Sequence, residues 1–247
     1  MQSQWNQVLA ITSNGTVTSA NSTNVGATGN ELTWSHTVAA GTNRALFVEI
    51  AIDSLGANVT SVTYGTQSLV QVGRSTGNHA VEIWALVAPT VGTANITVSF
   101  AGSTAAAAGA TTYNGVNQTT SYSGYAGATG TGTTSSVTVT SATGDLVIDA
   151  QYWQGIPTGG AVGASQTLLW ELQNANLTGG STSETGATSV VMSGSFTSSA
   201  QWEIGAVSIK AATNIAPVIT SNSGGAAASV NVTENSTAVT AVTATDA

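Results

Sequence analysis

Apolar residues of this chain alternate with other residues in short segments, and nowhere do they recur at the spacing of an amphipathic helix. In ALFVEIAID, residues 45–53, every second residue from Leu46 to Ile52 would share one face, and the residues between them, such as Phe47 and Glu49, would share the other. VEIWALVAP, residues 81–89, repeats the pattern. Alternation with a period of two places successive side chains on opposite faces of a β-strand, so it predicts an all-β fold.

Similar strand-like segments occur throughout the first 210 residues. They lie at residues 32–38, 59–64, 69–73, 94–100, 107–113, 136–140, 146–153, 167–173, 189–193 and 201–210. Turn clusters such as GTN, GNH, GATGTGTTS and PTGGAVGAS separate them. Because these connections are too short for parallel crossovers, we expect an antiparallel two-sheet β-sandwich of jelly-roll-like form. A right-handed β-helix is the main alternative, although the sequence shows no fixed repeat period.

Charge is scarce in this chain. Only 6% of the 247 residues are charged, with three Lys and Arg against eleven Asp and Glu, for a net charge of −8. This balance disfavours binding to nucleic acid or to anionic membranes, because both require cationic side chains. No apolar run approaches the roughly 20 residues of a membrane helix, so membrane insertion is not expected. Cysteine is absent, which excludes disulfides and thiolate chemistry.

A domain boundary is predicted near residue 212, where the strand-like AVSIKAATN is followed by IAPVITSNSGG and a new alternating segment. Residues 1–212 would form the β-sandwich module, residues 213–217 a linker, and residues 218–247 the truncated start of a second β domain. Pro217 and the pair Gly224 and Gly225 punctuate this last segment. The chain stops one residue after Asp246, in the middle of a strand-like run. We therefore expect the sequence to be a piece of a longer extracellular protein.

The last segment resembles the first strands of bacterial cadherin-like repeats. The resemblance is carried by APVITS at 216–221, VTEN at 232–235 and VTATD at 242–246. It implies that Glu234 and Asp246 are calcium ligands at the junction between modules, as in that family. The second aspartate of the family's pattern would fall beyond Ala247, so only a partial Ca²⁺ site is expected. The C-terminal strands could also be donated to another chain.

The larger part resembles, more weakly, a β-sandwich module that recurs in large secreted bacterial proteins. The segments that carry this resemblance are VTSVTYGTQSL, VEIWALVAPTVGTANITVSF, GDLVIDA and QWEIGAVSIK. It implies a non-enzymatic structural or adhesive module in an extracellular or cell-surface protein. Its partners would be neighbouring modules of the same chain, and also glycans or a cell-surface protein. Fibres of phages or virions share this composition and remain an alternative setting.

Catalytic patterns are weak, so we expect no enzyme. His36 alternates with core positions, which predicts an imidazole at the edge of the core that bonds a neighbour, and His79 lies in a turn. Lys210 is the only lysine and follows no glycine-rich loop, which disfavours a phosphate site. Asp145 and Asp149 lie four residues apart on one strand, about 13 Å, too far for a glycosidase pair. Asp145 is expected to serve its turn.

Tryptophan raises the alternative of a carbohydrate-binding module. Trp34, Trp170 and Trp202 alternate with apolar residues and are expected in the core. Trp153 instead follows Asp149 and Gln151 on a polar face and precedes a glycine-rich loop. An exposed aromatic ring beside polar groups can stack on a sugar, so these three residues form the predicted carbohydrate site.

Overall fold

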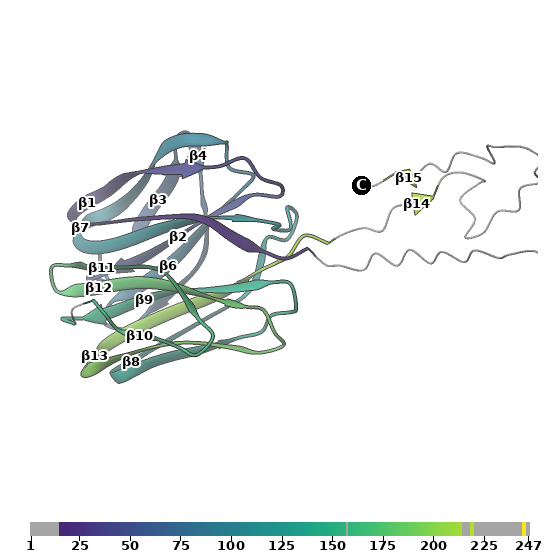
Figure 1. The fold of residues 1–247 in the computed structure, drawn as a ribbon. Helices are drawn as coiled ribbons and strands as arrows, with labels where there is room; N and C mark the ends of the chain where they lie inside the picture. Colours follow the sequence, from purple (N-terminus) through teal and green to yellow (C-terminus); the bar gives the residue numbers. More distant parts are fainter. Residues whose placement is uncertain (1–14, 157, 214–217, 220–243, 246–247) are drawn as a thin grey trace, which may run out of the picture. The chain divides into compact units, whose positions relative to one another are not determined.

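The computed structural model describes residues 15–156, 158–213, 218–219 and 244–245. Gly15–Ala212 forms one compact unit (Figure 1). A second unit groups the remaining residues, and in it the structure describes one antiparallel pair, β14 (Val218–Ile219) with β15 (Ala244–Thr245). Within the described ranges there is no helix, and therefore none that could cross a membrane.

Two antiparallel sheets make up the unit Gly15–Ala212, which confirms the predicted β-sandwich. The first sheet has the order β4-β3-β7-β2-β6-β5, with β1 also paired to β7. Its strands are β1 (Thr18–Val38), β2 (Ala45–Ile52), β3 (Val59–Tyr64), β4 (Gln67–Ser68), β5 (Val70–Thr76), β6 (Ala80–Val87) and β7 (Gly92–Asn114).

The second sheet has the order β10-β13-β9-β12-β11, with β8 also paired to β13. Its strands are β8 (Tyr122–Val139), β9 (Leu146–Gln154), β10 (Ala161–Val162), β11 (Thr167–Asn174), β12 (Leu177–Thr185) and β13 (Val190–Ile209). All pairings are antiparallel, so the β-helix alternative is excluded for this unit.

Each sheet folds back over its own outer face because its long strands bend. In β1 and β7 the pairing breaks between Gly29 and Glu31, opposite the stretch from Ser99 to Thr104. Strand β3 and the part of β7 that pairs with it, residues 96–100, then cover one face of β2. All eight residues of β2 are buried. Leu46, like its neighbours on one face of β2, packs in the core of the first sheet, while Phe47 packs against the second sheet. Strand β2 is thus buried on both faces.

The core between the sheets is shared by the two halves of the unit. Phe47, Ile83 and Tyr113 of the first sheet pack with Ile148 and Trp170 of the second. A separate core lies inside each folded sheet. Figure 1 shows the resulting stack, with β3 and β4 at one end, β2, β6, β9 and β12 in the middle, and β8, β10 and β13 at the other end.

The second sheet repeats the first. Strands β8, β9, β10, β11, β12 and β13 pair with one another as β1, β2, β3, β5, β6 and β7 do. The ladder break after Ser99 recurs after Ser195, again opposite a glycine, Gly132 in place of Gly29. The bulge before Gly73 of β5 recurs before Trp170 of β11. Residues 15–116 and 117–212 are therefore two halves with one topology.

The two halves also contact each other reciprocally. Strand β1 packs against β11 of the other half, and β5 packs against β8, which are the equivalent strands. Contacts of this reciprocal kind are those of a two-fold symmetric dimer, here joined into one chain. The sequence does not reveal the two halves, because equivalent positions carry different residues. Phe47, for example, corresponds to Ile148, and Ala51 to Tyr152.

Several strand assignments from the sequence were wrong or incomplete. The segment GATGTGTTS, predicted as a turn, lies within β8, and PTGGAVGAS, also predicted as a turn, contains β10. The short β4, the strand β12 and the first half of β1 were not predicted. Their side chains show no apolar alternation, so only pairing with neighbouring strands reveals them. In β8, Gly130 is needed because a Cβ there would lie 2.5 Å from the ring of Trp202.

Candidate functional site

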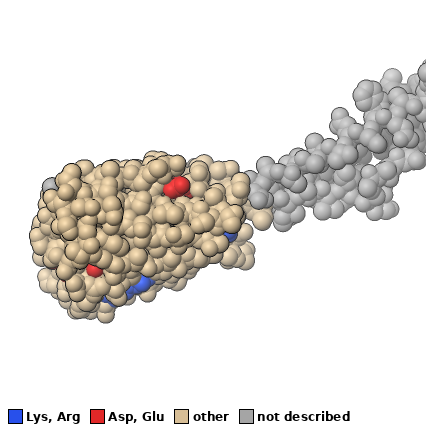
Figure 2. Space-filling model, turned by 90° about the horizontal axis from the view of Figure 1, so that it is seen from below, with Lys and Arg blue, Asp and Glu red and all other residues tan. Residues whose placement is uncertain are grey.

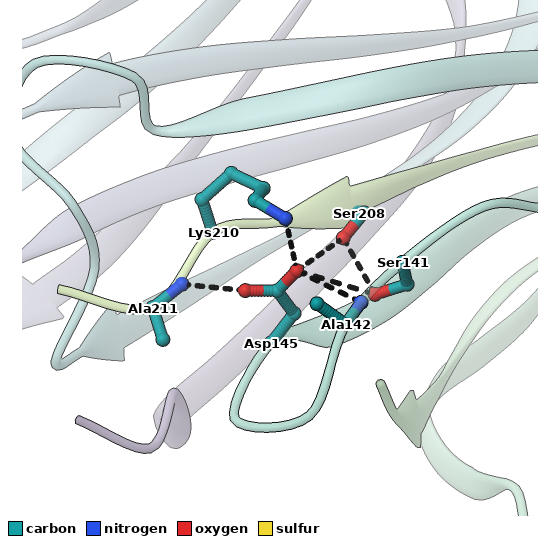
Figure 3. A network of polar contacts seen from close by, with 6 residues as sticks. All are labelled: Ser141, Ala142, Asp145, Ser208, Lys210 and Ala211. Atoms are coloured by element: carbon teal, nitrogen blue, oxygen red, sulfur yellow. Dashed lines mark hydrogen bonds and ion pairs between the residues drawn. The ribbon is translucent and has the colours of Figure 1, made fainter. Parts of the chain in front are cut away.

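The chain enters and leaves the unit at hydrogen-bonded neighbours, Gly15 and Ala212, and Asp145 lies beside them. Figure 3 shows the contacts that Asp145 makes there. Asp145 Oδ1 accepts the backbone N–H of Ala211 at 2.9 Å. Its Oδ2 accepts the N–H of Ala142 at 3.1 Å and forms an ion pair with Lys210. The hydroxyls of Ser141 and Ser208 also donate to Oδ2, at 3.4 and 3.3 Å. The expected role of Asp145 in its turn is confirmed, and the carboxylate also holds the last strand.

The first strand is tied to the same point. Val17 N donates to the carbonyl of Gly144 at 3.0 Å, and Gly15 N donates to the carbonyl of Ala212 at 3.1 Å. Ala212 N in turn donates to the carbonyl of Gly115 at 2.7 Å, at the end of the first half. The two ends of the unit are therefore hydrogen-bonded neighbours. Strand β9 runs from this point to Trp153, eight residues away, about 26 Å of extended chain.

Asp149, predicted as part of a carbohydrate site, is buried within the second half. Its Oδ1 accepts the N–H of Thr182 at 2.6 Å, and its Oδ2 accepts from Thr182 Oγ1 at 3.0 Å and from Gln151 Nε2 at 2.7 Å. Burial raises the pKa of Asp149 to about 7, although these hydrogen bonds oppose the rise. The carboxylate is fully engaged with neighbouring protein groups.

Gln151 and Trp153 lie beside Asp149 on the same face of β9, as predicted, but both are buried. Gln151 Oε1 accepts from Ser135 Oγ at 3.1 Å and from Trp153 Nε1 at 3.2 Å. The ring of Trp153 is only 2% exposed and packs edge-on against Phe196, with 4.8 Å between centroids. The sequence grouped these residues correctly, yet Trp153 offers no open face for a sugar, because the bent strands β8 and β13 cover this side of β9.

A small cavity remains beside this network. It measures about 30 Å³ and is lined by Gln151, Trp153, Glu171 and Phe196, among others. That is room for about one water molecule. The equivalent interior of the first half is filled, because Trp84 occupies the place of Thr182 and Val98 the place of Gly194.

A larger cleft opens next to this cavity, on the other side of Phe196. It measures about 340 Å³. Its walls are Ile156, Thr158, Gly159, Ala161, Ser195, Phe196, Thr197 and Ser198. All of these side chains are uncharged, and four of them carry hydroxyl groups. Sequence reasoning missed Phe196, although a lone aromatic residue within the polar stretch SGSFTSS is a signal that could have identified it.

His79 forms a second polar cluster, between the two halves, that the sequence did not indicate. Its ring stacks on Tyr152 at 4.2 Å, and Tyr152 donates a hydrogen bond of 2.6 Å to Asp53. His79 Nδ1 lies 3.6 Å from Glu203 Oε2, and neither atom has a hydrogen-bond partner. Burial lowers the pKa of His79 and raises that of Glu203. The backbone N–H of His79 also donates to Glu203 Oε1 at 3.2 Å, which joins the two halves here.

His36 behaves as predicted. It is buried, and its Nδ1 and Nε2 lie 2.8 Å from the hydroxyls of Thr23 and Thr112. Burial lowers the pKa of His36 to about 4, so the ring is neutral at physiological pH. Trp34 and Trp170 are also in the core as expected, whereas Trp202 is partly exposed.

The predicted calcium ligands Glu234 and Asp246 lie outside the described residues. In the part of the chain that the structure does describe, no group of three or more His, Asp or Glu side chains is placed to hold a metal ion.

Comparison with known proteins gives no relative for this chain: no family model matches it, and neither curated proteins nor solved structures show a match. The resemblance to cadherin-like repeats and to secreted β-sandwich modules therefore stays a prediction.

Proposed function

We propose that this chain is a non-enzymatic structural and adhesive module of a large extracellular or cell-surface bacterial protein. The observation that supports this proposal is the junction at Asp145, where the chain enters and leaves the unit side by side. Neighbouring modules would then attach at one end, leaving the opposite end of β9 free for contacts. The face shown in Figure 2 carries few charged side chains, which agrees with a body that remains soluble through hydroxyl and amide groups.

Force applied to the full chain through its two ends tests the structural role. We expect Gly15–Ala212 to unfold in one event at a resolved peak in single-molecule extension, because both ends are tied to the same hydrogen-bonded point. Asp145→Asn should lower the peak force, since it removes the ion pair to Lys210. Gradual extension without a peak would contradict the proposal.

Calcium at the junction with a following repeat belongs to the same proposal. Because the resemblance supplies only Glu234 and Asp246, isothermal titration of Ca²⁺ into this chain should show weak binding or none. A chain extended through the next aspartate of the repeat should bind more tightly, since Ca²⁺ takes six to eight oxygen ligands. Equal affinity in both chains would contradict the assignment.

A carbohydrate-binding module in the same extracellular setting is the second candidate. It is favoured by the uncharged cleft of about 340 Å³ beside Phe196, which lies at the end of the unit opposite Asp145. Binding of the full chain to an array of neutral oligosaccharides tests it directly, and an array without any bound glycan would exclude it.

A further inference from the structure

One phenylalanine occurs at the same place in both halves but in different surroundings. Phe100 follows Ser99 and Phe196 follows Ser195, at the equivalent break in the two ladders. Phe100 is 7% exposed, because it pairs with Val59 of β3. Phe196 is only partly buried, because β10 is only two residues long and pairs no further than Ser195. The shortened strand leaves Phe196 less covered than Phe100.

The space left by the shortened strand is the cleft of about 340 Å³, and its chemistry is specific. Phe196 supplies an aromatic surface, and Thr158, Ser195, Thr197 and Ser198 supply hydroxyl groups around it. Volumes of about 300 Å³ and more are typical of pockets for small ligands. An uncharged aromatic and hydroxyl lining suits a neutral, polyhydroxylated ring rather than an ion.

Neighbouring residues hold the cleft in shape. Phe196 is backed by the buried ring of Trp153. On the rim, Glu171 accepts the backbone N–H groups of Gly159 and Gly160 at 2.7 and 3.4 Å. Gly160 also lets the rim approach Phe196, since a Cβ there would lie 2.5 Å from the ring. A platform fixed in this way requires little reordering when a ligand binds.

We propose that Phe196 is the aromatic platform of a subsite for a neutral carbohydrate, with the hydroxyls of the cleft as its hydrogen-bonding partners. The inference rests on the carbohydrate-binding candidate above and assigns its contact residue to Phe196 rather than to Trp153. The apolar C–H face of a pyranose would lie on the ring of Phe196, while its hydroxyl groups exchange hydrogen bonds with Thr197 and Ser198. The first half, in which Phe100 is covered, has no such subsite.

The test uses the full chain and an array of neutral oligosaccharides that includes β-glucans, xylans, mannans and galactans. The Kd of the best-bound glycan is then measured by titration calorimetry. Phe196→Ala should weaken binding by at least about tenfold, as expected for an aromatic anchor. Phe196→Tyr should retain binding. Val191→Ala, also on β13 and 53% exposed, is the control that should leave affinity unchanged.

Thermal unfolding of each variant shows whether the fold is intact, and Ser198→Ala removes a hydroxyl at the rim without touching the core. A loss of affinity in both Phe196→Ala and Ser198→Ala, with melting preserved, supports the subsite. Wild-type affinity in Phe196→Ala overturns it while leaving carbohydrate binding elsewhere intact. Absence of glycan binding by the wild type overturns both, as does capture of an extended peptide in the cleft in place of any glycan.

Discussion

Replacing Glu49 with Gln should make the stability of this protein less dependent on pH. Glu49 lies on β2 in the core between the halves and is completely buried. Its Oε2 accepts the indole N–H of Trp170 at 3.1 Å, whereas its Oε1 has no hydrogen-bond partner. Burial, with a smaller contribution from the nearby Asp149, raises the pKa of Glu49 from 4.5 to about 8. At neutral pH the folded protein therefore keeps this group protonated.

Linkage between proton binding and folding determines how the free energy of unfolding depends on pH. Above pH 4.5 the unfolded chain releases the proton of Glu49 while the folded chain retains it, so the group's contribution to stability is lost progressively up to pH 8. One pKa unit corresponds to about 1.4 kcal/mol, so the contribution of Glu49 to the free energy of unfolding should fall by about 3.5 kcal/mol between pH 5 and pH 8. Glu49→Gln has no such proton to lose.

Urea unfolding at pH 5, 6, 7 and 8, followed by tryptophan fluorescence, measures this effect. The free energy of unfolding of Glu49→Gln minus that of the wild type should rise by about 3.5 kcal/mol from pH 5 to pH 8, or roughly 10 °C in Tm for a unit of this size. Glu31→Gln is the matched control, because Glu31 is exposed on β1 in the folded protein. A difference for Glu49→Gln as flat as that of the control would refute the buried, protonated carboxyl group.

Three further predictions concern other parts of the unit. Asp145→Asn should lower the free energy of unfolding by about 2 kcal/mol, because charged hydrogen bonds at the junction are lost, and an unchanged urea midpoint would contradict this. Gly73→Ala should cost about 1–3 kcal/mol, since its methyl group would overlap the ring of Tyr125, whereas Gly102→Ala, with nothing within 4 Å of its Cβ, should cost less than 1. The NMR signals of the His36 ring should titrate near pH 4, and titration near 6.5 would show that the ring is not buried.

Strands with regular apolar alternation could be predicted from the sequence. Leu46 and Phe47 fall on opposite faces of β2 as expected. Strands rich in glycine and threonine could not, because their stability comes from the chains beside them. In β12, Gly179 has no side chain because a Cβ would lie 3.0 Å from that of Ala51 in the other half. That constraint exists only once the halves are packed together.

The candidate site, too, could be predicted from the sequence only in part. Alternation correctly placed Asp149, Gln151 and Trp153 on one face of β9, but it could not show that this face is interior. The bend in β13 decides that, since it brings residues far along the chain over β9. The short strand β10 leaves Phe196 only partly buried, although its equivalent in the first half, Phe100, is buried.

By itself, the sequence determined that this protein is built of antiparallel strands with an almost uncharged surface, because both properties depend on local pattern and composition. Only the tertiary structure decided that the strands form two equivalent halves, and which of their faces are covered. The physical reason is that alternation states which side chains share a face of a strand. What lies against that face depends on pairing between segments that are distant in the chain.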